Sequence, residues 1–404
     1  MRKSSDERAD VVVVGGGVAG LAAARELGRR GLAAVVIESA AACGAGASGA
    51  AAGMLAPQAE ADRADALFEL LCASREMYPA FAEALGEEAG VDVELDRTGT
   101  LYLAFSAEDE EEVERRFAWQ SRAGLAVERV TAEEVRRLEP QVSPHVRAAL
   151  RFPRDWQVEN RLLVRALRAS AEGFGARVFE GAAALGVHVS PDGRARGVLT
   201  ESGTVWADAV VFAAGAWSSG LRKIIDAAGG AKPSEAELAD DPRVEPVRGQ
   251  MLCFRGHGSQ APLVRHVVYS PRGYLVPRRD GRLLAGSTTE REGFDCRVTE
   301  EGVAAVRAQA EEIAPGVASL ARADAWAGLR PRAADGLPVL GESADVRRLF
   351  YATGYYRNGI LLAPAAGRVV ADLVTAGATT LLPRAISTFS PARFRPALAG
   401  SHAE

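Results

Sequence analysis

The chain has 404 residues, of which 48% are hydrophobic and 25% charged, a composition typical of a soluble globular protein with about two to three domains. A net charge of −5 without any basic block argues against nucleic-acid binding. The four cysteines and five histidines show no metal-ligand spacing, so we expect reduced thiols and no metal site. The polar residues 1–8 lack a signal-peptide core and no apolar run approaches the length of a membrane span, which favours a cytoplasmic protein.

A buried strand followed by a glycine-rich turn is predicted at the start of the chain. Four consecutive valines, residues 11–14, are typical of a strand that is covered on both faces. Gly15, Gly17 and Gly20 then fit the pattern G-x-G-x-x-G, and the small and apolar residues that follow indicate a helix. In such units the glycines permit a tight turn, close approach to a pyrophosphate and close helix–strand packing, while the helix N-terminus attracts the diphosphate.

An acidic residue completes this nucleotide-binding pattern. Residues 33–37 are predicted to form a second buried strand that ends at Glu38, whose carboxylate can accept both hydroxyls of an adenosine ribose. Strand, glycines, helix, strand and acid occur in the expected order, so the pattern predicts dinucleotide binding, with a glycine turn that binds nothing as the alternative. The small residues 44–55 are either a flexible linker or a place where backbone amides approach the nucleotide.

The middle of the chain alternates between helical and strand patterns. Residues 91–95 and 99–105 alternate like the two strands of a hairpin. Helices are predicted at residues 64–86, 108–124 and 160–171, with a further one opened by a capping box at Thr131. Residues 209–214 repeat the pattern of a buried strand that runs into a glycine turn. We therefore expect separated segments of the chain to return to the nucleotide-binding sheet.

Short strands separated by turns dominate the second half. They are predicted at residues 246–254, 264–269, 273–278 and 282–286, and together with residues 91–105 they indicate an antiparallel sheet. Residues 226–243, rich in glycine, proline and acids, indicate an exposed insertion loop. A last buried strand with a glycine exit, residues 349–354, precedes a helix that runs to about residue 376.

Four separated motifs carry a resemblance to a known family. They are SGAAAGML at residues 48–55, YLVPR at 274–278, WAGLRP at 326–331 and RNGILLAP at 357–364. In these motifs the chain resembles the glycine oxidase branch of the D-amino-acid oxidase family of flavoproteins. The resemblance implies oxidation of small amines by non-covalently bound FAD, reduction of oxygen to hydrogen peroxide, and an imine product that feeds assembly of the thiamine thiazole ring.

The resemblance and the order of elements predict an α/β fold with two interleaved domains. A Rossmann-like FAD-binding domain comprises residues 11–90, 145–225 and 322–380. An antiparallel-sheet substrate-binding domain comprises residues 91–144 and 244–321, and residues 1–10 and 385–404 are tails.

The same resemblance implies the residues of the site. Arg330 is expected to pair with the substrate carboxylate, assisted by Tyr274 and with Arg357 close by. From the residues alone, Tyr274 could equally be a core aromatic, and Arg357 could pack over the flavin edge or form a structural ion pair. Ala184 is expected to meet the adenine end through its backbone. With the glycine turn, the cofactor-binding residues are Gly15, Gly17, Val18, Ala19, Gly20, Glu38, Ser39, Ala47, Ser48, Ala52, Gly53, Met54, Ala184, Tyr355, Tyr356, Arg357, Asn358, Gly359, Ile360 and Leu361.

Three departures from relatives affect these expectations. Arg272 stands where relatives carry a histidine and Thr289 where they carry a methionine, both by the expected substrate mouth, so the preferred substrate is left open. The insertion at residues 226–243 is absent from shorter relatives. Relatives with covalent flavin use a cysteine near the position of Gly328, and its absence here predicts a dissociable flavin.

The expected reaction moves a hydride from the α-carbon of a neutral amine to flavin N5 and needs no obligatory protein base. The protein then supplies placement, for which the planar fork of Arg330 suits a carboxylate. Two alternatives stay open: a D-amino-acid dehydrogenase that passes electrons to a quinone or carrier, and a non-catalytic nucleotide-binding scaffold or NAD-dependent enzyme. The expected partners are a small amine and oxygen, without nucleic acid or a membrane span. Homo-oligomer formation is open.

Overall fold

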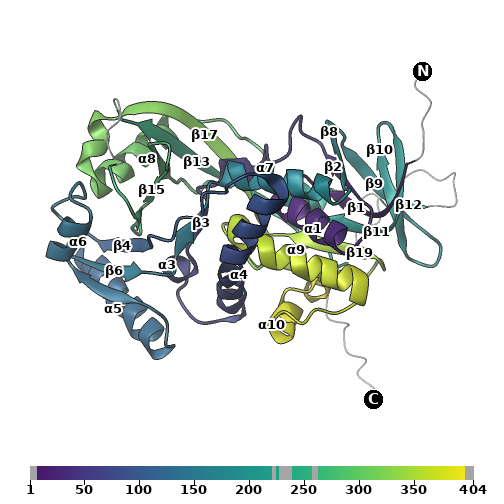
Figure 1. The fold of residues 1–404 in the computed structure, drawn as a ribbon, viewed down its shortest axis with the longest axis horizontal. Helices are drawn as coiled ribbons and strands as arrows, with labels where there is room; N and C mark the ends of the chain where they lie inside the picture. Colours follow the sequence, from purple (N-terminus) through teal and green to yellow (C-terminus); the bar gives the residue numbers. More distant parts are fainter. Residues whose placement is uncertain (1–6, 221–223, 227–238, 257–262, 396–404) are drawn as a thin grey trace, which may run out of the picture.

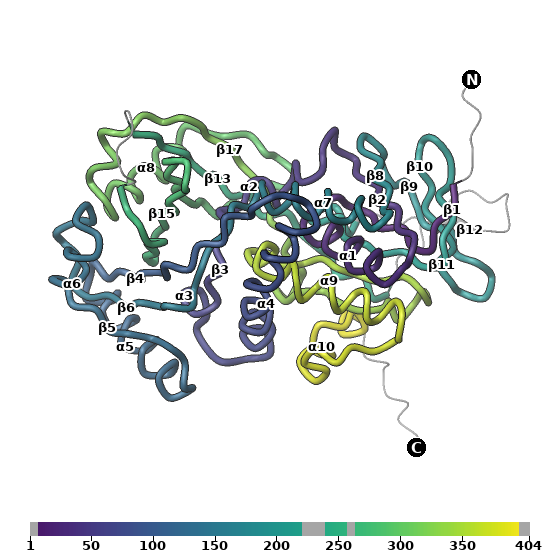
Figure 2. The backbone as a smooth tube through the Cα atoms, viewed as in Figure 1, coloured from purple at the N-terminus to yellow at the C-terminus, as the bar shows by residue number. Residues whose placement is uncertain are grey.

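The computed structural model describes residues 7–220, 224–226, 239–256 and 263–395. Two β-sheets occupy the two ends of an elongated molecule, and helices pack between and beside them (Figure 1). The chain passes repeatedly from one end to the other, so neither end is formed by one continuous segment (Figure 2). This mixed α/β architecture confirms the predicted fold class.

The larger sheet has nine strands and is built around β1 (Glu7–Val14). β1 pairs in parallel with β2 (Ala34–Glu38) and with β11 (Gly203–Phe212), and β11 pairs in parallel with β19 (Leu349–Thr353). The valines of β1 are buried, as expected for a strand that is covered on both faces. The other strands of this sheet are β8 (Arg177–Glu180), β9 (Ala184–Val189), β10 (Ala195–Thr200), β12 (Ile224–Asp226) and β18 (Val339–Glu342).

Helices α1 (Val18–Arg29) and α9 (Gly359–Ala376) pack on one face of this sheet (Figure 1). Helices α4 (Ala66–Ala89) and α7 (Asn160–Gly173) pack against them, and all four share the main hydrophobic core. A Cβ on Gly367 would lie 2.7 Å from the carbonyl oxygen of Ala22, so the glycine lets α9 pack directly on the backbone of α1.

Helix α9 differs from one sequence-based expectation. Its 18 residues have a mean hydropathy of 1.5, so by length and composition it resembles a membrane span, which we did not predict. Within the protein, 67% of this stretch is buried, and it packs against α1 and α4 as a core helix.

The second sheet has eight strands, all antiparallel to their neighbours except for the parallel pair β14–β4. In spatial order they are β17 (Ala321–Arg332), β13 (Glu245–Arg255), β16 (Arg282–Gly286), β15 (Tyr274–Pro277), β14 (Val267–Tyr269), β4 (Thr100–Ala104), β6 (Ala148–Phe152) and β5 (Glu128–Thr131). The helices α5 (Ala107–Arg122), α6 (Ala132–Leu138) and α8 (Glu300–Ile313) pack beside it. The predicted capping box at Thr131 is confirmed, since Thr131 and Glu134 exchange hydrogen bonds at the start of α6.

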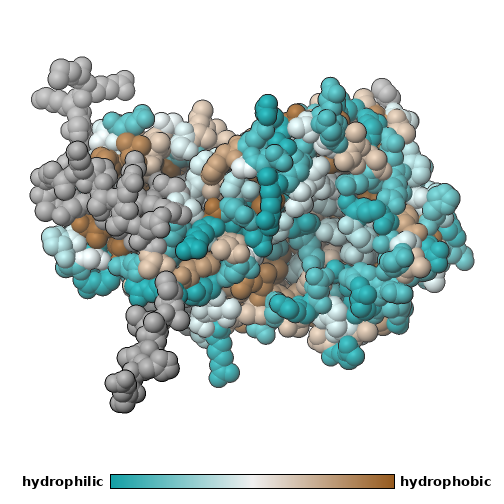
Figure 3. All heavy atoms as spheres, turned by 180° about the vertical axis from the view of Figure 1, so that it is seen from behind, coloured by the Kyte–Doolittle hydropathy of each residue, from teal (hydrophilic) through white to brown (hydrophobic). Residues whose placement is uncertain are grey.

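The remaining elements are short. They are α2 (Ala47–Ala50), β3 (Met54–Leu55), α3 (Pro57–Glu60), β7 (Trp156–Gln157), η1 (Gly215–Gly220), η2 (Pro315–Ser319), α10 (Pro383–Thr388) and η3 (Pro391–Phe394). Viewed from behind, the described surface is largely polar, and its hydrophobic residues form separate patches (Figure 3).

Two sequence-based expectations differ from the structure, and a third is not tested by it. The predicted hairpin is wrong: residues 91–95 form no strand, and β4 pairs instead with β14 and β6, so alternation alone misidentified its partner. The predicted domain limits at 145 and 322 place β6 and β17 with the FAD-binding segments, whereas both strands pair within the second sheet. Most of the predicted insertion loop, residues 227–238, lies outside the described residues.

Candidate functional site

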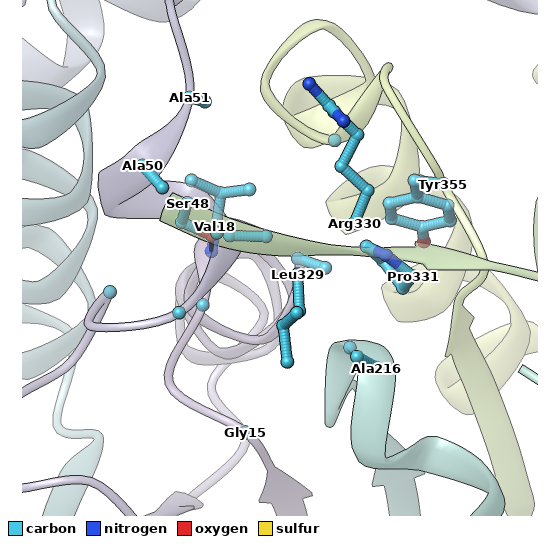
Figure 4. Close-up of a pocket in the computed structure, with 18 of the residues that line it drawn as sticks. Gly15, Val18, Ser48, Ala50, Ala51, Ala216, Leu329, Arg330, Pro331 and Tyr355 are labelled. Atoms are coloured by element: carbon cyan, nitrogen blue, oxygen red, sulfur yellow. Dashed lines mark hydrogen bonds between the residues drawn. The ribbon is translucent and has the colours of Figure 1, made fainter. Parts of the chain in front are cut away.

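A cavity of about 610 Å³ lies where the two sheets meet. The glycine turn after β1 and the segment around α2 line one side of it, and β13, β15 and β17 line the other. Figure 4 shows this arrangement: Leu329 and Arg330 point to opposite sides of β17, with Ser48 and Ala50 on one side of the strand and Tyr355 near Pro331. Residues that are distant in sequence therefore share one space.

The glycine turn has the geometry that a dinucleotide requires. Gly15 has a φ of +109°, and a Cβ there would overlap the carbonyl oxygen of Ala213, so only glycine fits. A Cβ on Gly20 would overlap the carbonyl oxygen of Gly15, which explains the close packing of α1 on β1. Gly17 lines the cavity and stands before α1 without a side chain that could cap the helix. Of the N–H groups in the first turn of α1, that of Val18 donates to Ser48 Oγ at 3.0 Å, and the others can meet a ligand.

Glu38 lies at the end of β2, where the sequence pattern predicts the ribose acceptor. One carboxylate oxygen accepts a hydrogen bond from Gly16 N and the other from Ala40 N, both at 2.7 Å. These bonds fix the carboxylate in the cavity wall. The oxygen that accepts from Ala40 N also accepts from Ser39 Oγ at 3.3 Å, so a free lone pair remains on the other oxygen. The carboxylate can accept two ribose hydroxyls once the Ser39 hydroxyl turns away.

The small-residue segment 44–55 is held in place by side chains outside the cavity. This excludes the interpretation of the segment as a flexible linker. Arg278 donates from Nη2 to the carbonyl oxygen of Ala52 at 2.7 Å, and Asn160 donates to that of Ser48 at 2.8 Å. Burial lowers the pKa of Arg278 to about 10. A Cβ on Gly53 would overlap the carbonyl oxygen of Val158. Sequence analysis missed Arg278 and Asn160 as supports, although Arg278 ends one of the quoted motifs.

Arg330 lines the cavity, but protein oxygens already engage its guanidinium. Nη1 donates to the carbonyl oxygen of Thr288 at 3.1 Å, and Nη2 donates to Ser287 Oγ at 2.7 Å. A Cβ on Gly249 would overlap the guanidinium, so this glycine gives the side chain its place against β13. Among the described contacts, the N–H on Nε and one N–H on Nη2 remain for a carboxylate.

Tyr274 is buried and also lines the cavity. Its hydroxyl donates to Met251 Sδ at 3.2 Å. Its ring stacks on Tyr269 at 6.0 Å, and Tyr269 stacks on Tyr102 at 5.6 Å, with interplanar angles of 20° in both pairs. Tyr274 is therefore a rigid part of the wall whose hydroxyl faces the same space as Arg330.

Arg357 separates this cavity from a second one of about 820 Å³, because Glu60, Arg357 and Asn358 line both. Arg357 donates to Glu60 at 3.2 Å and to the hydroxyl of Tyr269 at 3.0 Å. The neighbouring carboxylate of Glu60 raises the pKa of Arg357 above its ordinary value. In this structure Arg357 thus forms the ion pair that we considered as its alternative role.

The structure brings together almost all the predicted site residues. Of the predicted cofactor-binding residues, only Gly20 does not line the cavity, since it packs against Gly15 instead. Arg272 and Thr289, expected at the mouth, do not line it either: Arg272 pairs with Asp109 and Glu312, both at 2.9 Å. Several lining residues were not predicted, among them Glu60, Trp217, Gly249, Met251 and Leu329.

Polar groups of the cavity wall that lack a hydrogen-bond partner also fit the FAD implied by the sequence. The hydroxyl of Tyr355 is buried in the wall and has no hydrogen-bond partner among the described residues. Helices α1 and α9 both begin at the cavity, and neither is capped by the side chain of its own N-cap residue, although Ser48 Oγ accepts from Val18 N at 3.0 Å. An extended ligand with a hydrogen-bonding ring and a diphosphate would satisfy these groups.

Comparisons with known proteins agree with this geometry. The family description "FAD dependent oxidoreductase" matches residues 10–373. Over 369 residues the chain is 36% identical to "Glycine oxidase" of Geobacillus kaustophilus, which covers 91% of this chain and 93% of that protein. The crystal structure of glycine oxidase from Geobacillus kaustophilus matches with a TM-score of 0.86 and 34% identity, covering 98% of this chain and 100% of the other.

A second kind of relative is longer than this chain. "Bifunctional protein ThiO/ThiG" of Synechocystis is 34% identical over 388 residues, which span 95% of this chain but 54% of that protein. The family description and the glycine oxidases match along nearly the whole of this chain, including both sheets. The chain therefore belongs to the D-amino-acid oxidase family of FAD-dependent oxidoreductases, in its glycine oxidase branch.

Proposed function

We propose that this FAD-dependent oxidoreductase oxidises glycine and other small amines, such as sarcosine and D-alanine, in the cytoplasm. Oxygen is the electron acceptor and hydrogen peroxide a product, and the imine supplies thiamine thiazole synthesis. The observation that carries the proposal is the single cavity that joins the glycine turn after β1 to the side chains of Arg330 and Tyr274. The similarity to proteins named glycine oxidase supports the same substrate class.

Bound FAD supplies a hydride acceptor at N5, and the residues of the chain supply placement. The remaining N–H groups of Arg330 and the hydroxyl of Tyr274 bind the substrate carboxylate and thereby orient its α-carbon. Ala52, Met54 and Leu329 give the cavity apolar walls that exclude water. No histidine lines the described cavity, and Glu60 is paired with Arg357, so the amine must arrive in its neutral form.

A screen of amines for peroxide formation tests this proposal. The purified yellow protein is mixed with each amine in air, and peroxide is measured; a parallel anaerobic experiment follows bleaching of the flavin. Bleaching together with peroxide supports an oxidase. Bleaching that yields no peroxide in air would instead support the dehydrogenase alternative. A protein that purifies without flavin would contradict both the oxidase and the dehydrogenase.

A further inference from the structure

Strand β13 presents alternate residues to the cavity. Gly249 and Met251 line it, whereas Leu252 points to the hydrophobic core on the other face of the sheet. Gly249 accommodates the guanidinium of Arg330, and Met251 follows two residues later beneath the hydroxyl of Tyr274. Met251 therefore contacts Tyr274, one of the two groups to which we assign the substrate carboxylate, and lies two residues from Gly249, which accommodates the other.

Met251 is also held firmly. It is 3% exposed and packs with Ala52 and Tyr274 in one apolar cluster. Its strand neighbour Gly286 has no space for a side chain, because a Cβ there would overlap Met251 Sδ and lie 2.6 Å from the Tyr274 hydroxyl. The methionine side chain thus cannot retreat toward β16 when a larger ligand enters.

The contact between Met251 and Tyr274 suits a hydroxyl that must change partner. A thioether sulfur is a weak acceptor, whereas a carboxylate is a strong one. The hydroxyl of Tyr274 therefore stays near the ligand position, and it loses only a weak hydrogen bond when it turns from Met251 Sδ to a bound carboxylate. The methyl end of Met251 then fills the space beside the bound carboxylate.

We propose that Met251 sets the upper size limit of the substrate by closing the cavity beside Tyr274. This inference rests on the proposed function. A glycine or D-alanine molecule fits within the limit, while a branched or aromatic group on the amine or the α-carbon meets the methionine side chain. Replacing Met251 by alanine removes three of its four side-chain heavy atoms and opens room at that place only.

The experiment compares Met251→Ala with Met251→Leu and Cys253→Ala. Met251→Leu keeps the volume but loses the sulfur. Cys253 lies two residues further along the same face of β13, is also 3% exposed and does not line the cavity, so Cys253→Ala is a matched control. Met251→Val, which a strand accommodates well, replaces the alanine variant if that variant does not retain FAD.

Two measurements are made on each FAD-loaded protein: kcat/KM for glycine and D-leucine, and binding of acetate and benzoate followed by the flavin absorption spectrum. Because one methylene in an apolar pocket changes discrimination by roughly 10–200-fold, the ratio of D-leucine to glycine should rise at least about tenfold in Met251→Ala. Benzoate should bind correspondingly tighter. Met251→Leu and Cys253→Ala should keep the wild-type ratio.

An unchanged ratio and unchanged benzoate binding in Met251→Ala would overturn the inference, as would an equal change in Cys253→Ala. Failure of the proposed function has a different signature: no amine bleaches the flavin of the wild-type protein. The carboxylate-binding measurement still tests the size limit in that case, since it requires no turnover.

Discussion

The guanidinium of Arg330 faces the cavity and also ties residues 287–288 to β17, so its replacement has two separable effects. Arg330→Ala should lower kcat/KM for glycine by about ten- to a hundredfold, because a charge-assisted pair contributes roughly 1.5–3 kcal/mol. Arg330→Lys keeps the charge without the fork and should recover part of the loss. Steady-state kinetics with glycine and with an amine that lacks a carboxylate checks this, alongside the FAD content.

The amine without a carboxylate is the informative control. It should respond little to Arg330→Ala if the main role of Arg330 is binding the carboxylate. An equal loss for both substrates would instead assign Arg330 to holding Ser287 and Thr288, which its hydrogen bonds also permit.

A buried carboxyl group gives the protein a pH-dependent stability. Asp155 is fully buried, accepts from Ala59 N at 2.8 Å and pairs with Arg75 at 3.0 Å. Burial raises the pKa of Asp155 from 3.8 to about 7. Between these values the folded protein binds a proton that the unfolded chain does not, so the free energy of unfolding falls as pH rises, by up to ~1.4 kcal/mol per pH unit.

Asp155→Asn should remove this contribution. The variant is expected to be less stable than the wild type above about pH 7, where Asp155 is ionised and pairs with Arg75. Its free energy of unfolding should decline less between pH 4 and pH 7 than that of the wild type. Denaturant unfolding at several pH values measures the two slopes. Identical slopes would mean that Arg75 keeps Asp155 ionised throughout this range.

At the scale of elements, the turn between β1 and α1 separates two kinds of glycine. Gly17→Val places a branched side chain in the cavity wall, 3.1 Å from Ser48 Oγ at its Cβ, where a diphosphate would bind. We expect a folded protein without colour. Gly15→Val should destabilise the fold as well, because φ is +109° and the side chain would overlap Ala213.

Absorption at 450 nm and thermal unfolding measure these two effects. Gly86→Ala is a suitable control, since Gly86 lies within α4 and a Cβ there meets no atom within 4 Å. It should retain FAD and stabilise α4 by roughly 0.5–1 kcal/mol. Full flavin occupancy in Gly17→Val would show that the turn does not contact the diphosphate.

The elements that the sequence predicted best are those encoded by local patterns. The valines of β1, the glycines after it, Glu38 and the capping box at Thr131 each specify a geometry within a few residues. Strand pairing is not local in this way. β4 pairs with β14, which lies more than 160 residues later in the chain, and nothing around residue 100 identifies that partner.

The candidate site shows the same division. Several lining residues of the quoted motifs, such as Tyr274 and Arg330, were predicted, although Leu329 was not. Gly249 and Met251 were not predicted either, although their strand was. The alternating pattern places Gly249 and Met251 on one face of β13 but does not show that this face lines the cavity. Which face lines the cavity depends on the pairing of β13 with β16 and β17. A structural ion pair of Arg357 was considered, but its partner Glu60 lies almost 300 residues away and was not identified.

At the scale of the whole molecule, the prediction concerns which amino acids enter. The cavity joins a nucleotide-binding turn to Arg330 and Tyr274. If the proposed function holds, glycine, sarcosine and D-alanine should bleach the flavin while L-amino acids should not. Stopped-flow absorbance under anaerobic conditions measures the rates. Fast bleaching by an L-amino acid together with no response to glycine would contradict the substrate class that we propose.

The cavity wall extends from Val14 to Leu361, with contributions from both sheets, and this has a consequence for biosynthesis. At about 5–20 residues per second, a ribosome needs on the order of half a minute to proceed from Glu38 to Leu361. Throughout that time the nascent chain has a ribose acceptor and a glycine turn but lacks the start of α9. Capture of the flavin must therefore follow translation of nearly the whole chain, and a scarcity of riboflavin would leave complete but colourless polypeptides.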